Sequence, residues 1–398
     1  MTLVLKNTRG TWVPFAYGFR PFFLLAGVYA LVSIAMWLRV YLGGTSPLPP
    51  LPPQYWHGHE MIFGFISAAI AGFLLTAVPS WTGRTGVAGF RLMILTILWL
   101  VGRVAFFMGD VLPIPLFAAA ELAFVPVLIL MLAPALVGSG NRNWPMLLVL
   151  AALWMSDVMF IAGLYKGDAL VSRNALLAAL NLVLLLMTVI GGRIVPAFTR
   201  NALRAASKDV SLRSSKVVDH LVIVSMLTYG LFDVFSGDST TTAVIAVLTA
   251  GLQLWRLLGW QGWRTMHQPI VWVLHLGYAW IPVGLALKAA WIVGGFGWAA
   301  YWQHAFGIGA ASMMIVAVMT RAALGHTGRS LKVHGLITIA YGLLALAAVV
   351  RVFGTTLFPF HYSTVVLMAG VLWVSAFVPY LFIYAPILLR KRVDDKPG

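Results

Sequence analysis

The sequence contains no cysteine. This absence excludes disulfides, thiolate-bound iron–sulfur clusters, zinc-finger-like sites and a cysteine nucleophile. Acidic residues are scarce as well, with 11 Asp and Glu against 27 Lys and Arg, and the only glutamates are Glu60 and Glu121. A carboxylate-rich di-iron centre needs several inward-facing glutamates and Glu-x-x-His pairs, so this class of site is excluded too.

Charge of either sign is rare, because 10% of the residues are charged and 61% are hydrophobic. Soluble domains have about 25% charged and about 45–50% apolar residues, so this chain lacks the polar surface of a water-exposed globule. Its apolar runs reach the length of about 20 residues that crosses a hydrocarbon core as a helix. They lack the polar–apolar alternation of a membrane β-barrel. The composition therefore predicts an all-α, polytopic transmembrane helix bundle.

Turn-like stretches such as "VGSGNRN" and "SGDST" divide the chain into about 12 apolar segments. The expected spans are 21–43, 57–79, 88–108, 112–137, 143–165, 170–196, 216–236, 240–260, 269–293, 299–320, 332–353 and 361–388. We expect a single membrane domain over 1–398, with two six-span halves at about 1–200 and 201–398. The basic loop "TRNALRAASKDVSLRSSK" joins the halves.

The basic residues indicate the orientation of the spans. Most Lys and Arg residues lie at the termini and in alternate loops, whereas connections such as 44–56 and 294–298 hold almost none. The positive-inside rule then predicts that both termini are cytoplasmic. This asymmetry explains the net charge of +16, and no nucleic-acid motif accompanies it. The expected partner is a lipid bilayer and not nucleic acid.

Histidines lie at two expected depths. His57, His59 and His304 are near the non-cytoplasmic ends of spans 2 and 10, whereas His275 and His326 lie toward the cytoplasm. Because a helical residue rises about 1.5 Å, His275 and His304 should differ in height by roughly 20 Å. One metal ion cannot bind both, so the sequence predicts two sites or one extended cofactor arrangement.

Imidazole is the obvious metal ligand in a chain without cysteine, and it suits haem iron and copper. His57 and Glu60 share one helix face, while His59 points about 200° away from His57. Glu60 can orient a ligating histidine through the second ring nitrogen, or relay protons. Haem propionates need basic partners, for which Arg103, Lys288, Arg193 and Arg321 are the candidates.

Structural explanations compete with these assignments. Arg103, Glu121 and Asp157 lie at similar expected depths in three spans, and pairing with one another is the least costly way to keep charges in a bilayer. Histidines near an interface can simply reach the headgroups. A chain of 12 spans in two halves with intramembrane charges also fits a proton-coupled permease.

Five blocks of sequence resemble the NnrS family, bacterial membrane proteins described as containing haem and copper. The blocks are "GFRPFFLLAG" at 18–27, "WHGHEMIFGF" continuing to "AGFLLTAVPSWTGR" at 56–84, "GGRIVPAFTRN" at 191–201, "HLGYAWIPVGLALK" at 275–288 and "HAFGIGAASMMIVAVMTRAALGHTGR" at 304–329. The family's paired histidines match His57 and His59, with Gly58 where alanine is usual. Its other recurring histidines match His275, His304 and His326, and its recurring arginines match Arg193 and Arg321.

The resemblance implies a haem–copper protein of the bacterial inner membrane that acts on nitric oxide, in nitrosative stress or denitrification. A b-type haem held among His57, His59 and His304, with Arg193 and Arg103 beside it, is our interpretation of the cofactor site. His275 and His326 form a second, inner group of metal ligands, and copper can lie near either group. Glu60 and Arg321 are the candidate catalytic residues of a nitric oxide oxidoreductase with an unknown electron donor. The alternatives are the permease and a haem-binding sensor of nitric oxide without turnover.

Overall fold

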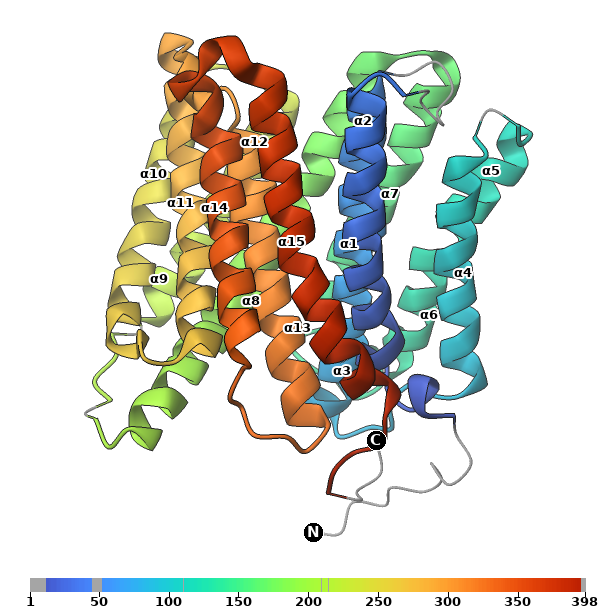
Figure 1. Cartoon of the computed structure of the whole chain (residues 1–398), viewed down its shortest axis with the longest axis vertical. Coiled ribbons are helices and arrows are strands. Elements are labelled where there is room, and N and C mark those ends of the chain that lie inside the picture. Colours follow the sequence, from blue (N-terminus) through green and yellow to red (C-terminus); the bar gives the residue numbers. More distant parts are fainter. Residues whose placement is uncertain (1–11, 45–51, 110, 209, 214, 395–398) are drawn as a thin grey trace. The chain divides into compact units, whose positions relative to one another are not determined.

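The computed structural model describes residues 12–44, 52–109, 111–208, 210–213 and 215–394. Long helices dominate these residues, and none of them forms a strand (Figure 1). Within the described residues, twelve helices are long and apolar enough to cross a membrane. The prediction of an all-α bundle with about 12 spans is therefore confirmed, because continuous apolar runs leave a bilayer-embedded backbone few options except helices.

The described residues form two compact units. Unit 1 comprises 1–179, 319–331 and 380–398, and unit 2 comprises 180–318 and 332–379. The division within the first half of the chain falls at Ala179, inside a helix, and not in the basic loop near 200. The two six-span halves remain a prediction.

Most of unit 1 comes from the first five spans. Its elements are η1 (Val13–Phe15), α1 (Phe19–Tyr41), α2 (Pro53–His59), the π-helix η2 (Glu60–Ile66), α3 (Ser67–Thr82), α4 (Phe90–Phe107), α5 (Ile114–Leu122), α6 (Phe124–Val137) and α7 (Pro145–Lys166). Helix α1 packs against α3, α4 against α5, and α6 against α7. The second span therefore consists of α2, η2 and α3, so a π-helix interrupts it within its first half.

In unit 2, the π-helix η5 interrupts a second span. The elements of unit 2 are α9 (Lys216–Phe235), α10 (Thr240–Gly259), η3 (Gly262–Thr265), α11 (Pro269–Gly294), η4 (Gly297–Ala299), α12 (Trp302–His304), η5 (Ala305–Ser312), α14 (Gly335–Leu357) and η6 (Pro359–His361). Three helices have residues in both units: α8 (Ala169–Ala205), α13 (Met313–His326) and α15 (Tyr362–Leu389). Helix α8 extends to Ala205, so the basic loop expected from 199 begins later than predicted.

Close packing of α1 on α3 depends on Gly72. A Cβ atom there would lie 2.6 Å from the Phe23 ring and 3.1 Å from the Phe22 Cβ. We expect Gly72→Ala to lower the free energy of unfolding by about 1–3 kcal/mol, because extra volume in a packed core forces side chains and backbone apart. Thermal unfolding in detergent measures the effect.

Gly342 in α14 provides the matched control, because a Cβ atom there would meet no atom within 4 Å. Gly342→Ala should be neutral or stabilising by up to about 1 kcal/mol, since alanine has the higher helix propensity. Equal stability of the two variants would contradict this account of the α1–α3 contact.

Candidate functional site

A buried polar cluster lies in unit 1 where α2 gives way to the π-helix η2. His59 is the last residue of α2 and Glu60 the first of η2, and both are fully buried. The two ring nitrogens of His59 have different partners. Its Nδ1 lies 2.8 Å from Oε1 of Glu60, and its Nε2 lies 2.9 Å from Oδ1 of Asp157 in α7. Oε1 of Glu121 in α5 is 3.8 Å from the same Nε2.

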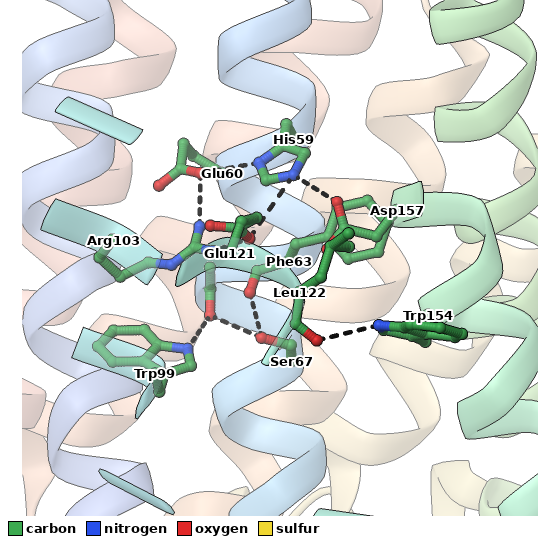
Figure 2. A network of polar contacts seen from close by, with 11 residues as sticks. His59, Glu60, Phe63, Ser67, Trp99, Arg103, Glu121, Leu122, Trp154 and Asp157 are labelled. Atoms are coloured by element: carbon green, nitrogen blue, oxygen red, sulfur yellow. Dashed lines mark hydrogen bonds and ion pairs between the residues drawn. The ribbon is translucent and has the colours of Figure 1, made fainter. Parts of the chain in front are cut away.

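Arg103 from α4 joins the two glutamates. Its Nη1 donates to Oε1 of Glu60 over 2.5 Å, and its Nη2 donates to Oε1 of Glu121 (Figure 2). The expectation that Arg103 pairs with Glu121 is confirmed. Asp157, expected as a third partner of Arg103, instead contacts His59. We call His59, Glu60, Arg103, Glu121 and Asp157 the His59 cluster.

Aromatic rings pack around the cluster. The Phe106 ring is stacked on the His59 imidazole at 4.0 Å between centroids, and Phe63 and Phe160 lie within 4.8 Å of it. The guanidinium of Arg103 lies over the Trp99 ring, whose indole N–H donates to the Gly64 carbonyl. In such a low-dielectric surrounding, the interactions between the charged groups are strong and an unpaired charge is costly.

Glycine makes room for the charged side chains. A Cβ atom at Gly102 would lie 3.0 Å from Oε2 of Glu121, and one at Gly64 would lie 3.3 Å from Nη1 of Arg103 and 2.3 Å from the Tyr29 ring. The neighbouring helices therefore approach closely enough for α4, α5 and η2 to contribute to one cluster.

His57 does not belong to this cluster. Its ring is half-buried and stacked on Trp37, with 4.6 Å between the centroids and an angle of 20° between the planes. A shift of two residues turns a helix by about 200°, so the two histidines of α2 face different neighbours. The sequence predicted this divergence but not which histidine meets the carboxylates.

His275 in α11 of unit 2 is buried and has a defined hydrogen-bond partner. Its Nε2 lies 2.8 Å from Oγ1 of Thr199, whose hydroxyl donates to the carbonyl of Val195. With its own proton directed to Val195, the Thr199 oxygen can accept a hydrogen bond from Nε2–H, which is the tautomer in which Nδ1 keeps a lone pair. No described residue provides a hydrogen bond to that Nδ1. The lone pair is compatible with the predicted ligand role, although Gly262 packs close to the ring.

His304 is the last residue of α12, and the π-helix η5 follows directly. Its ring is half-buried and lies edge-on to Tyr301. Arg193, predicted beside the haem, is exposed on α8 of unit 2, and Arg321, a candidate catalytic residue, is half-buried on α13 of unit 1. His326, in unit 1, lies beside the rings of Tyr17 and Phe19, and its backbone carbonyl accepts from Arg392 over 2.5 Å.

One group of potential metal ligands is found among the described residues: His59, Glu121 and Asp157. Reasoning from the sequence named His59 as a ligand but assigned Glu121 and Asp157 only to charge pairing. Their position as acids inside apolar spans, where carboxylates are rare and often functional, could have identified them as potential ligands.

Comparison with known proteins supports the resemblance seen in the sequence. The chain matches none of the curated proteins with which it was compared. The family model described as "NnrS protein" matches residues 13–392, nearly the whole chain. The protein therefore belongs to the NnrS family, and it is an integral membrane protein linked to nitric oxide.

Proposed function

We propose that this protein binds a b-type haem and copper in the bacterial inner membrane and acts on nitric oxide. Family membership supports the link to nitric oxide. The structural observation that carries the proposal is the position of two candidate histidines. His59 and His304 each directly precede a π-helix, η2 and η5 respectively. Such wide turns are rare and occur frequently at functional sites.

The surroundings of His304 fit a haem ligand. Gly307 lies one turn further on in η5, and a Cβ atom there would meet no atom within 4 Å. Gly309, by contrast, packs against Trp280, where a Cβ atom would lie 2.4 Å from the indole. We propose that a flat macrocycle approaches the half-buried imidazole of His304 at Gly307, whereas Gly309 serves helix packing.

Each unit offers its own candidates for haem contacts. Both ring nitrogens of His59 face carboxylates, so His57 is the haem-iron candidate of unit 1. Arg103 is held by Glu60 and Glu121, and Lys288 by Asp233 and Asp238. Arg193, which matches one of the family's recurring arginines and is exposed on α8, is our candidate for a propionate partner. When bound, haem iron supplies the coordination site for nitric oxide. Arg321 remains a proposed catalytic side chain.

The donors available for copper differ between its oxidation states. His59, Glu121 and Asp157 offer one nitrogen and two oxygens, which suit divalent copper, whereas cuprous copper prefers sulfur ligands. His275 and His326 each supply one imidazole and remain candidates for a second position. We therefore propose that copper in the His59 cluster, where present, is divalent.

A haem-loading experiment tests the proposal. The purified chain, expressed with ample haem, should show a Soret band that shifts on addition of nitric oxide. His304→Ala should lose most of this absorbance, while His220→Ala, which removes an exposed ring from α9, should retain it. A correctly folded but colourless wild-type protein would overturn the haem proposal.

The buried charged groups favour a second candidate function, the proton-coupled permease. Proton-coupled transport by a colourless protein reconstituted in vesicles would support the permease. Consumption of nitric oxide with an added electron donor separates an oxidoreductase from a sensor, because a sensor binds nitric oxide without turnover.

A further inference from the structure

We propose that His59, Glu121 and Asp157 bind one divalent transition-metal cation through an imidazole nitrogen and two carboxylate oxygens. The three potential ligand atoms lie within 4.8 Å of one another. Two of the separations are 2.9 Å, from Nε2 of His59 to Asp157, and 3.8 Å, from Nε2 to Glu121. Metal–ligand bonds of about 2.1 Å place neighbouring ligand atoms roughly 3 Å apart, so small side-chain movements complete the site.

The charge of the His59 cluster favours a divalent ion. Three carboxylates face one guanidinium, which leaves two negative charges in excess when all four groups are ionised and His59 is neutral. The side chains of Glu60 and Glu121 are at most 1% exposed, so solvent does not compensate this excess, and either proton uptake or a bound cation must remove it. A bound divalent cation makes the cluster neutral, whereas a monovalent cation leaves one negative charge in a low-dielectric interior.

The contacts of His59 point to the same arrangement. A neutral imidazole has one N–H group, yet both ring nitrogens of His59 lie within 2.9 Å of a carboxylate oxygen. With a metal at Nε2, the ring proton resides on Nδ1, and this N–H group donates to Oε1 of Glu60. Asp157 then becomes a ligand of the metal. This is the carboxylate–histidine–metal arrangement that fixes the tautomer of metal-binding histidines. Glu60 is thus a positioning residue, held in turn by Arg103.

The cluster also has room for a further ligand. A cavity of about 10 Å³ is lined by Arg103, Glu121 and Asp157 together with apolar side chains. This volume is about the minimum that holds one water molecule. Oε2 of Glu121 is buried and has no hydrogen-bond partner among the described residues. A metal-bound water in the cavity would supply the missing donor.

The donor set selects the class of ion. Nitrogen and oxygen donors suit Zn²⁺, Fe²⁺, Mn²⁺ and Cu²⁺, and no thiolate is available because the chain has no cysteine. Cuprous copper lacks both its preferred ligands and the second charge here. The inference deepens the proposed copper position in the His59 cluster and shares its ligands, but it does not rest on haem or nitric oxide, since it follows from charge and geometry in unit 1 alone.

Cobalt substitution tests the inference on the full-length chain. The purified protein, with any affinity tag removed, is treated with a chelator and then titrated with Co²⁺, whose visible absorption reports coordination. We expect about one Co²⁺ per chain, displaced by Zn²⁺ and not by Cu⁺ kept reduced. Elemental analysis after desalting checks the stoichiometry.

Two variants and a control identify the ligands. Glu121→Gln and Asp157→Asn preserve size and should each weaken Co²⁺ binding by at least tenfold. Asp168→Asn changes an exposed carboxylate that caps α8, where asparagine also accepts hydrogen bonds, and should bind Co²⁺ like the wild type. Glu60→Gln should retain stoichiometric binding with an altered absorption spectrum, as expected for a residue that acts through His59.

The wild-type titration decides the question even if a variant fails to fold. Saturable binding of one Co²⁺ supports the inference, and so does its loss in folded Glu121→Gln protein. Absence of stoichiometric binding by the folded wild type, or preference for Cu⁺, overturns it. If His304→Ala loses the Soret band but binds Co²⁺ like the wild type, metal binding by the His59 cluster is independent of haem binding.

Discussion

Replacing Arg103 by methionine is expected to lower the free energy of unfolding by about 3–5 kcal/mol, because removing one partner of a buried ion pair leaves the other charge uncompensated. The guanidinium is the only cationic group paired with Glu60 and Glu121 in the described part of unit 1. Without it, three carboxylates share one buried site. The folded fraction after graded heating in detergent, measured by size-exclusion chromatography, reports the loss.

A second substitution checks that the effect is electrostatic. Arg103→Met combined with Glu121→Gln removes one negative charge together with the positive one, so the double variant should recover part of the lost stability. Arg103→Lys should be intermediate, because a single ammonium group does not reproduce the forked contact with two carboxylates. Additive destabilisation in the double variant would contradict the proposed coupling.

Lys288→Met is expected to have a comparably large effect in unit 2, again about 3–5 kcal/mol. The Lys288 ammonium, 1% exposed, lies 3.0 Å from Oδ1 of Asp233 and 2.7 Å from Oδ1 of Asp238. It also lies 4.0 Å from the centre of the Trp302 ring. Asp233 is buried, so methionine at position 288 leaves its charge without this cation, whereas Asp238 is 42% exposed and can be solvated. The same chromatographic assay measures the change.

Asp233→Asn is the compensating change for Lys288→Met. Asn181 donates to Oδ2 of Asp233 over 2.9 Å, and the side-chain carbonyl of asparagine at 233 can accept that hydrogen bond. The double variant contains neither buried charge and should be more stable than Lys288→Met alone. If Asp233→Asn does not relieve the destabilisation, the contact of the ammonium group with the Trp302 ring, and not the ion pair with Asp233, is the main contribution of Lys288.

Some features of the site were predictable from local sequence. Arg103 and Glu121 lie at similar expected depths in neighbouring spans, and the need to neutralise charge in lipid predicted their pairing. Likewise, the helical turn of about 200° between His57 and His59 predicted different surroundings for the two rings. Both arguments need only the rise and rotation of a helix.

Other features depended on contacts between distant parts of the chain. The sequence did not predict that the π-helix η2 begins at Glu60, because one extra residue per turn leaves no mark in an apolar run. It also did not predict that Asp157 lies opposite His59, since their separation of 98 residues is bridged only by the packing of unit 1.

The sequence by itself determined the membrane-embedded helical architecture and the set of groups available for chemistry. Hydrophobic length and the absence of cysteine are properties of the chain that no folding alters. The tertiary structure alone decided that His59, and not His57, meets two further carboxylates, because α5 and α7 deliver Glu121 and Asp157 to one face of α2. Ligand geometry requires several groups within a few ångströms, and only the packing of separate helices sets such distances.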